Sequence, residues 1–213
     1  GGSYTYFNYS PATNDAGELV VLAGQTIYRV TPGALTRLAQ TTDAVSGVSG
    51  TYQSFPTPPR INATGQVLFA AVAGSGSQFI ASPSSTISLA FSGNTPIQNA
   101  AGRLSTPYFV GDINASGTVF YVGSRKPDPS ASAIEGAFSY SNGVLRMIAN
   151  RGDVVPGTGG ETISNVLQRR DANDAGYVAF TASTDSRSHL VVHDGTQLVR
   201  YLSTGTALPG GGQ

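Results

Sequence analysis

The sequence carries one short pattern four times at nearly even spacing. The pattern is Asn-x-x-Gly-x-Val-x-Phe, and its asparagines lie at positions 14, 62, 114 and 173, which are 48, 52 and 59 residues apart. A period of about 40–50 residues is typical of proteins built from repeated small β-sheets. We therefore predict four copies of one unit in a single domain, residues 1–213, with approximate boundaries at 3–47, 48–102, 103–160 and 161–213.

Each copy of the pattern has the chemistry of a tight turn followed by a strand. An asparagine side chain can bond to the backbone two residues on, and glycine tolerates positive φ, so Asn-x-x-Gly closes a turn between two strands. Val67 and Phe69, like Val178 and Phe180, are two residues apart and share one face of a strand. The predicted structural turn residues are Asn14, Gly17, Asn62, Gly65, Asn114, Gly117, Asn173 and Gly176.

Each copy also contains a second hairpin and a leading strand. The second hairpins turn at residues 32–33, 82–85, 142–143 and 193–195, two of them through Asn-Gly or Asp-Gly, which are strong hairpin signals. The leading strands are predicted before the asparagine turns, at residues 4–7, 52–55, 108–110 and 163–167. No segment has a sustained helical period. We predict an all-β, β-propeller-like fold of four blades with four antiparallel strands each, and almost no helix.

Two features resemble known families. The order of leading strand, turn, alternating strand and hairpin is similar to blades of the Tol-system periplasmic propeller and other WD-like propellers. The repeat pattern followed by Gly-Asp-x-x-Pro-Gly, residues 152–157, resembles the tandem repeats of bacterial secreted and surface-anchored proteins. The resemblance implies a propeller-type fold and a surface location, and it transfers no catalytic residue. The first copy departs from the pattern at Val20-Val21, and the second lacks a clear Gly-Asp-x-x-Pro-Gly loop.

The two ends of the chain suggest how the units are arranged. In this register the chain starts at a first strand, and residues 208–213 are similar to the loop 155–160 that leads from the third copy into the fourth. Three arrangements follow: a closed four-bladed ring, a larger ring made by two chains, or head-to-tail addition into a filament.

Composition narrows the partners and the location. Charged residues make up 11% of the chain, the formal net charge is zero and Lys126 is the only lysine, so we expect no nucleic-acid partner. The longest apolar stretch, Val67 to Ala73, is too short for a membrane helix, and no insertion into a membrane is expected. The scarcity of lysine and glutamate beside many small hydroxylated residues favours an extracellular, cell-surface or periplasmic protein whose signal peptide has been removed.

Metal and cofactor chemistry has little support. The chain contains no cysteine. His189 and His193 could share a strand face with Asp194 nearby, but a zinc site needs three or four ligands. A solvent-facing strand edge is therefore the better interpretation of the two histidines. Asp171, Asn173 and Asp174 loosely match the alternating oxygen ligands of a calcium loop, although turn geometry explains them better. We expect no cofactor.

Two surface motifs have competing interpretations. Arg151-Gly152-Asp153 is the tripeptide that integrins bind, but here it belongs to the repeat's linking loop. Asn8, Asn62 and Asn114 head glycosylation acceptor patterns. Asn62 and Asn114 are also turn residues whose side chains should bond to the backbone, so Asn8 is the freer candidate.

No catalytic arrangement is visible in the sequence, whether a nucleophile beside a base, paired acids or a phosphate-binding glycine loop. We therefore expect a non-catalytic extracellular structural or interaction protein that binds itself, a surface glycan or another protein, with head-to-tail self-assembly into a filament or ring. The alternatives are a secreted glycan-binding propeller, with Tyr4, Tyr6 and Tyr9 as a stacking shelf, and a polysaccharide hydrolase or lyase.

Overall fold

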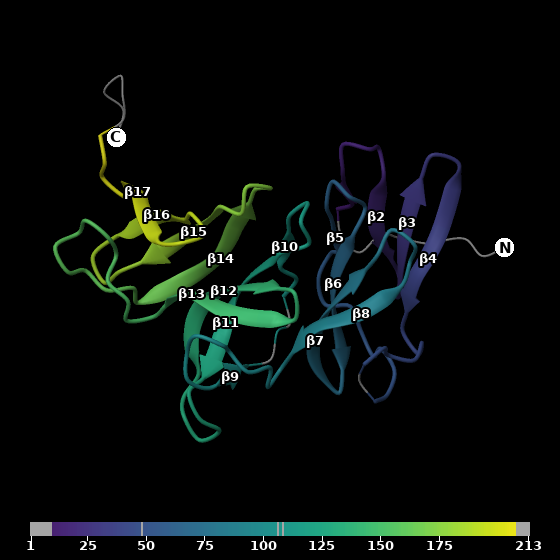
Figure 1. Ribbon diagram of the computed structural model, residues 1–213, viewed down its shortest axis with the longest axis horizontal. Coiled ribbons are helices and arrows are strands. Elements are labelled where there is room, and N and C mark those ends of the chain that lie inside the picture. The colour runs from purple at the N-terminus through teal and green to yellow at the C-terminus, as the bar shows by residue number, and fades with distance from the viewer. Residues whose placement is uncertain (1–9, 48, 106, 108, 208–213) are drawn as a thin grey trace.

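The computed structural model describes residues 10–47, 49–105, 107 and 109–207, and it is all-β, with no helix in those ranges. The strands form four separate antiparallel sheets, one for each copy of the repeat, arranged in a row along the longest axis (Figure 1). In each sheet the strands follow one another in chain order, so each sheet is a simple meander. The prediction of an all-β fold with four antiparallel sheets is confirmed.

The strands of the four sheets are as follows. Sheet 1 contains β1 Ala12–Thr13, β2 Leu19–Ala23, β3 Thr26–Thr31 and β4 Ala34–Gln40. Sheet 2 contains β5 Arg60–Ile61, β6 Val67–Ala73, β7 Ser75–Ala81 and β8 Ile87–Ser92. Sheet 3 contains β10 Asp112–Ile113, β11 Val119–Lys126, β12 Ile134–Ser141 and β13 Val144–Asn150, with the short β9 Arg103–Leu104 pairing to β11. Sheet 4 contains β14 Asn165–Ala172, β15 Val178–Ser183, β16 Ser188–His193 and β17 Leu198–Ser203.

The Asn-x-x-Gly turn joins the first two strands of every sheet. Its glycine has a φ of +74°, +78°, +81° and +86° in the four copies, a range that residues other than glycine rarely adopt. In each turn the glycine N–H donates to the asparagine carbonyl three residues earlier, at 2.9–3.1 Å. The recurring glycine is therefore required by the backbone itself.

The predicted leading strands are wrong in two copies that can be compared. The first strands of sheets 2 and 3 are two-residue strands directly before the asparagine, not residues 52–55 and 108–110. Prolines at 56, 58 and 59 lack the N–H that a strand ladder needs, so pairing resumes only at Arg60. Tyr52 and Phe55 instead pack inward, with Tyr52 2% exposed and its ring 5.2 Å from that of Phe79, while the exposed Ser54 forms a single bridge to Val72. Residues 4–7 and 108 lie outside the described residues, and 163–167 overlaps β14.

Three apolar cores lie between successive sheets, and the second strands of the two middle sheets, β6 and β11, each contribute to two of them. In sheet 2, Val67 and Phe69 of β6 pack against sheet 1, while Leu68 and Ala70 of the same strand pack against sheet 3. A strand buried on both faces reads as a continuous apolar run, as residues 67–73 do. The Val-x-Phe part of the repeat is thus the face that each sheet turns toward its predecessor.

The departure of the first copy from the pattern follows from this geometry. Leu19 and Val21 occupy its Val-x-Phe positions, and no other described sheet lies in front of sheet 1, so both side chains stay half-exposed. The equivalent aromatic residues Phe69, Tyr121 and Phe180 are at most 3% exposed. An aromatic residue is present only where a preceding sheet buries it.

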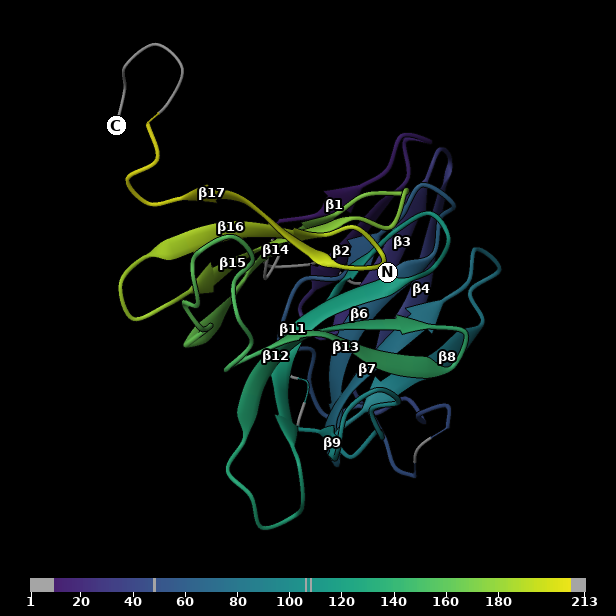
Figure 2. The ribbon, with the colours of Figure 1, turned by 60° about the vertical axis from the view of Figure 1, so that its left-hand side comes forward.

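The four sheets do not close into a ring. Sheets 1 and 4 lie at opposite ends of the molecule in Figure 1, and Figure 2 shows the chain after β17 leading away from the other sheets. The expectation of a closed four-bladed ring is therefore wrong for the described residues. Each sheet instead contacts mainly its neighbours in the chain, as in other repeat proteins.

This packing predicts unequal costs for truncating equivalent residues. Phe69→Ala should lower the free energy of unfolding by about 3–5 kcal/mol, because it removes a fully buried ring and leaves a cavity. Val21→Ala, at the same repeat position but half-exposed, should cost about 1 kcal/mol or less. Urea unfolding followed by near-ultraviolet circular dichroism measures both, and equal losses would contradict the assignment of faces.

Candidate functional site

The four pattern asparagines form a ladder that joins the repeats, called here the asparagine ladder (Asn14, Asn62, Asn114 and Asn173). Asn14 Nδ2 donates to the carbonyl oxygen of Asn62 at 3.0 Å, and Asn62 Nδ2 donates to that of Asn114 at 2.7 Å. Asn114 Nδ2 lies 3.4 Å from the carbonyl oxygen of Asn173 and completes the series. Every step runs in the same direction, from the side chain of one repeat to the backbone of the next.

The same side chains close their own turns. Each asparagine Oδ1 accepts from the backbone N–H four residues on, at 3.0, 2.8, 2.9 and 3.0 Å in chain order. One amide therefore accepts within its repeat and donates to the next repeat, a combination that aspartate cannot supply because an ionised carboxylate has no donor. The turn motif predicted from the sequence is also the inter-repeat joint, and this second role was missed.

In the first two repeats, the residue after the turn glycine packs onto the next repeat; the third repeat lacks this contact, since nothing lies within 4 Å of a β-carbon placed at Gly176. A β-carbon added to Gly65 would lie 2.7 Å from Glu18 Oε2, and one added to Gly117 would lie 3.0 Å from Gln66 Oε1. Glu18 and Gln66 therefore lie against the turn glycine that follows. No atom lies within 4 Å of the corresponding point at Gly17, the first turn glycine.

Buried polar side chains reinforce the first two junctions. Arg29, 3% exposed, donates from Nη2 to the carbonyl oxygens of Gly65 and Ser82 at 2.7 and 2.9 Å, and from Nη1 to that of Pro83. Gln78, fully buried, donates from Nε2 to the carbonyl oxygen of Phe109 at 2.9 Å. Both side chains extend from the third strand of one sheet to the backbone of the next.

A linking loop follows the last strand of every sheet, including the second, where the sequence seemed to lack it. Asp43 Oδ2, Thr95 Oγ1, Asp153 Oδ2 and Thr206 Oγ1 each accept from the backbone N–H three residues earlier, at 2.8, 3.0, 2.8 and 3.1 Å. Threonine replaces aspartate in the second and fourth copies, which hid the motif. Asp153 of the Arg151-Gly152-Asp153 tripeptide is thus engaged in this loop, and burial raises the pKa of its carboxyl group.

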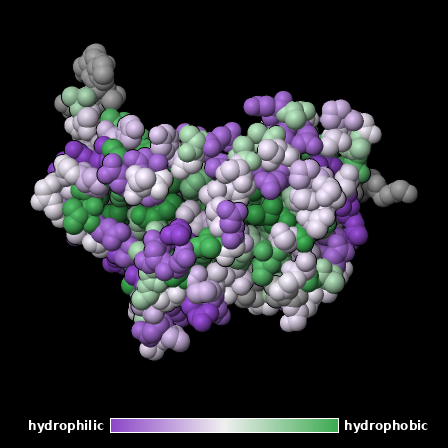
Figure 3. All heavy atoms as spheres, viewed as in Figure 1, coloured by the Kyte–Doolittle hydropathy of each residue, from purple (hydrophilic) through white to green (hydrophobic). Residues whose placement is uncertain are grey.

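The outer face of sheet 4 is apolar and uncovered by any other described sheet. Leu190 and Leu202 pair across β16 and β17 and are 39% and 44% exposed. The equivalent face of sheet 3 carries Phe120 and Val122, which are 4% and 3% exposed. The other described side chains of this outer face include Ala179, Thr181, Val192 and Val199, all partly exposed, and the polar Asp171, Ser183 and Ser188. Figure 3 shows apolar patches among polar ones over the half of the molecule that holds sheets 3 and 4.

The last ladder asparagine is exposed at the edge of this face. Asn62 and Asn114 are each 4% exposed, whereas Asn173 lies at the surface. Its Oδ1 closes the turn, but its Nδ2 has no acceptor among the described residues, in contrast to the other three. Tyr177, at the repeat position of Glu18 and Gln66, is 47% exposed beside it.

A hydrogen-bonded cluster around His189 ties a linking loop to sheet 4. His189 is 1% exposed, so the expectation of a solvent-facing histidine is wrong. Its Nε2 lies 3.1 Å from Glu161 Oε2 and its Nδ1 lies 2.8 Å from Ser203 Oγ. Glu161 Oε2 also accepts from Thr184 Oγ1 at 2.8 Å, and Arg187 lies 3.2 Å from Glu161 Oε1. These residues are spread between positions 161 and 203 without a recognisable motif, so no sequence pattern predicts the cluster.

The remaining metal candidates engage backbone groups. His193 Nδ1 accepts from the N–H of Gly195, and Asp194 accepts from Thr196 and Gln197, which lowers the pKa of Asp194 to about 2. Asp174 Oδ1 accepts from the N–H of Ala115 in the preceding repeat at 2.7 Å, and Asp171 accepts from the next residue. Within the described ranges, no three His, Asp or Glu side chains gather as a metal site would require.

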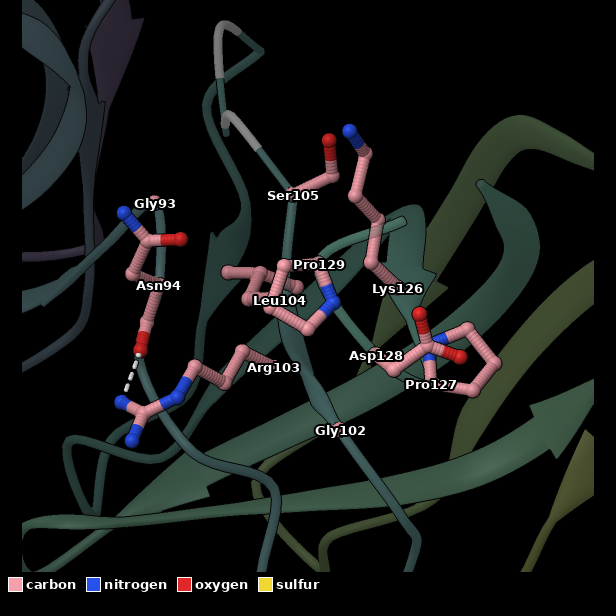
Figure 4. Close-up of a pocket in the computed structure, with 10 residues that line it drawn as sticks. All are labelled: Gly93, Asn94, Gly102, Arg103, Leu104, Ser105, Lys126, Pro127, Asp128 and Pro129. Carbon is pink, nitrogen blue, oxygen red and sulfur yellow. Dashed lines mark hydrogen bonds between the residues drawn. The ribbon is translucent and has the colours of Figure 1, made fainter. Parts of the chain in front are cut away.

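A pocket of about 280 Å³ lies between β9 and the loop that follows β11 (Figure 4). Its charged lining residues are Arg103, Lys126 and Asp128. Arg103 donates to the carbonyl oxygen of Asn94, and hydrogen bonds from Ser130 lower the pKa of Asp128. The Lys126 ammonium and the Asp128 carboxylate point in different directions in Figure 4, so the pocket does not present a paired acid and base.

Some predicted surface sites cannot be placed. Asn8, Tyr4, Tyr6 and Tyr9 lie outside the described residues. Asn62 and Asn114 are buried and hydrogen-bonded in the ladder, so a glycan on either would have to replace a repeat junction.

Taken together, the sheets and their junctions define a β-repeat protein whose successive four-stranded sheets are stacked through apolar cores and one polar ladder. The chain belongs to a family of unknown function, DUF7453, whose pattern matches residues 1–208. No curated protein matches the sequence. Within the described residues there is no helix with the length and apolarity that crossing a membrane would require.

The asparagine ladder predicts that truncating Asn62 destabilises the fold more than truncating Asn173. Asn62→Ala should lower the free energy of unfolding by about 2–3 kcal/mol, because it leaves the turn N–H of Gln66 without its acceptor and removes the bond to the Asn114 carbonyl of the next repeat. Asn173→Ala, which removes the same turn bond at an exposed site, should cost about 1 kcal/mol. Equal losses in chemical denaturation would show that the bond between repeats contributes nothing.

The Glu161 cluster predicts a defined pH dependence. The hydrogen bond from Thr184, further bonds from Ser186 and His189, and the charge of Arg187 hold the pKa of Glu161 below its usual range. Such a carboxylate stabilises the folded state above the pKa it has in the unfolded chain, and this contribution is lost as pH falls through the folded pKa.

Glu161→Gln should therefore lower Tm most at pH 6–7, and the difference from the wild type should shrink below about pH 4. Thermal unfolding from pH 3 to 7 measures this, with Asp185→Asn, an exposed acid of the neighbouring loop, as the control. A difference that is independent of pH would contradict an ionised Glu161 in the cluster.

Proposed function

We propose that this protein is a non-catalytic, extracellular structural or interaction protein that associates with itself through the outer face of sheet 4. The observation that carries the proposal is the contrast between equivalent faces. Sheets 1, 2 and 3 each bury this face under the next sheet, whereas sheet 4 exposes it with Leu190, Leu202 and their neighbours.

The chemistry of the face supports association. Of the seven large apolar side chains most exposed in the described residues, four belong to the fourth repeat: Tyr177, Leu190, Tyr201 and Leu202. A contiguous exposed apolar surface on a soluble protein is typical of an interaction site. A sheet face that stays in water usually carries polar side chains, whereas the outer face of sheet 4 exposes Leu190 and Leu202.

The composition supports a location outside the cell. A single lysine, no cysteine and 11% charged residues are features that we associate with secreted or surface proteins. The residues that recur in the repeat are used in turns, ladder bonds and apolar cores, which supports a structural role over a catalytic one.

Sedimentation equilibrium between about 5 and 200 µM tests the proposal. The wild-type chain of 21.8 kDa should show a mass that rises with concentration, and Leu190→Lys should abolish the rise because the face would have to bury a charge. Val154→Lys, which alters a 56%-exposed apolar residue on a linking loop, is the matched control and should associate as the wild type does. A wild type that remains monomeric throughout would sink the proposal.

A further inference from the structure

We infer that the occupant of the sheet 4 face is sheet 1 of a second copy, bound head-to-tail in the geometry of the internal junctions. The inference rests on the proposed function and adds the identity and orientation of the partner. It follows from what the two ends of the stack present, which are the two halves of one repeat junction.

The apolar halves correspond position by position. At each internal junction the following sheet contributes its Val-x-Phe positions, such as Val67 and Phe69 against sheet 1. In sheet 1 these positions are Leu19 and Val21, both half-exposed, and Leu35 on the same face is 60% exposed. Sheet 1 therefore offers a mainly apolar surface to the outer face of sheet 4, and the charged Arg37 on this face is paired with Asp43 at 3.2 Å.

The hydrogen-bonding groups of sheet 4 and sheet 1 also correspond to the two sides of an internal junction. Asn62, Asn114 and Asn173 each use the carbonyl oxygen twice, to accept from a turn glycine and from the preceding ladder asparagine. Among the described residues the Asn14 carbonyl oxygen accepts only from Gly17, at 3.1 Å. The unused amide of Asn173 and the unused lone pair of Asn14 are the donor and acceptor of a fourth ladder step.

Two neighbouring residues fit the same register. Tyr177 occupies the position from which Glu18 and Gln66 cover the next turn glycine, and the space above Gly17 is open. At the third junction, Asp174 accepts from the backbone N–H of Ala115, the residue after the ladder asparagine. Asp15 of the first repeat holds the same position as Asp174, so it can accept from the N–H of Asp174 in the preceding copy.

The direction of the ladder argues against a symmetric pairing of two sheet 4 faces. Such a dimer would set two Asn173 amide donors against each other with no carbonyl between them. The face and its partner are different surfaces, so the contact is heterologous and each bound copy presents a new sheet 4 face. The expected products are linear chains of molecules, or rings where the rotation per copy closes.

Complementary blocked variants test this orientation. Leu190→Lys blocks the sheet 4 face and leaves sheet 1 intact, whereas Val21→Lys blocks the sheet 1 face and leaves sheet 4 intact. Each variant alone should be monomeric, with association weakened at least about tenfold. An equimolar mixture should form a one-to-one dimer of two 21.8-kDa chains that grows no further, as measured by light scattering after size exclusion.

The outcomes separate the inference from the proposed function. If Val21→Lys alone forms dimers while Leu190→Lys does not, the sheet 4 face binds itself, and the head-to-tail inference falls while self-association stands. If the mixture of the two variants stays monomeric although the wild type associates, the partner surface is not sheet 1, and the inference is again overturned. A monomeric wild type overturns both.

Two further variants protect the test from misfolding. If Val21→Lys or Leu190→Lys does not give the wild-type circular dichroism spectrum, Leu35→Lys or Leu202→Lys takes its place. Leu35 and Leu202 are both exposed, so a lysine at either position should not disturb the fold. Asn173→Ala should weaken association of the wild type several-fold without blocking it, because it removes the polar step and keeps the apolar one. Unchanged association in Asn173→Ala would exclude the ladder from the contact between copies.

Discussion

A single asparagine side chain in each repeat sets both the local turn and the joint to the next sheet. Its oxygen closes the turn that begins the second strand, and its nitrogen reaches the backbone of the following asparagine. Because the two functions share one planar amide, the turn geometry fixes where the next repeat must lie. The apolar cores then form on both sides of the second strands of sheets 2 and 3 and on one side of those of sheets 1 and 4, and the ladder keeps successive sheets in the same register.

This arrangement makes the stack directional and leaves its two ends different. The first sheet keeps small apolar residues at positions where later sheets carry a buried aromatic ring, and the last sheet exposes the face that earlier sheets cover. Both ends expose apolar side chains, and the same faces carry the charged Arg37 on sheet 1 and Asp171 on sheet 4. An interaction role for the protein, rather than chemistry in a pocket, is the function that these ends support.

The sequence predicts the repeating parts of this structure well, because local rules determine them. Asn-x-x-Gly turns, Asn-Gly and Asp-Gly hairpins and apolar alternation identify the sheets and their strand order. The leading strands were misplaced because alternation at Tyr52–Phe55 resembles a strand, while the prolines that follow prevent pairing. The ladder, the buried Arg29 and the Glu161–His189 cluster depend on contacts between distant segments, and an arrangement of sheets without ring closure cannot be deduced from strand order.

Hydrogen exchange of the asparagine side-chain amides, followed by nuclear magnetic resonance, tests the ladder most directly. The account predicts slow exchange for the Nδ2 protons of Asn62 and Asn114 at all concentrations. It predicts fast exchange for those of Asn173 in dilute solution and slow exchange once the protein associates. Fast exchange at Asn62 and Asn114, or an Asn173 amide that exchanges at the same rate in dilute and associated protein, would contradict it.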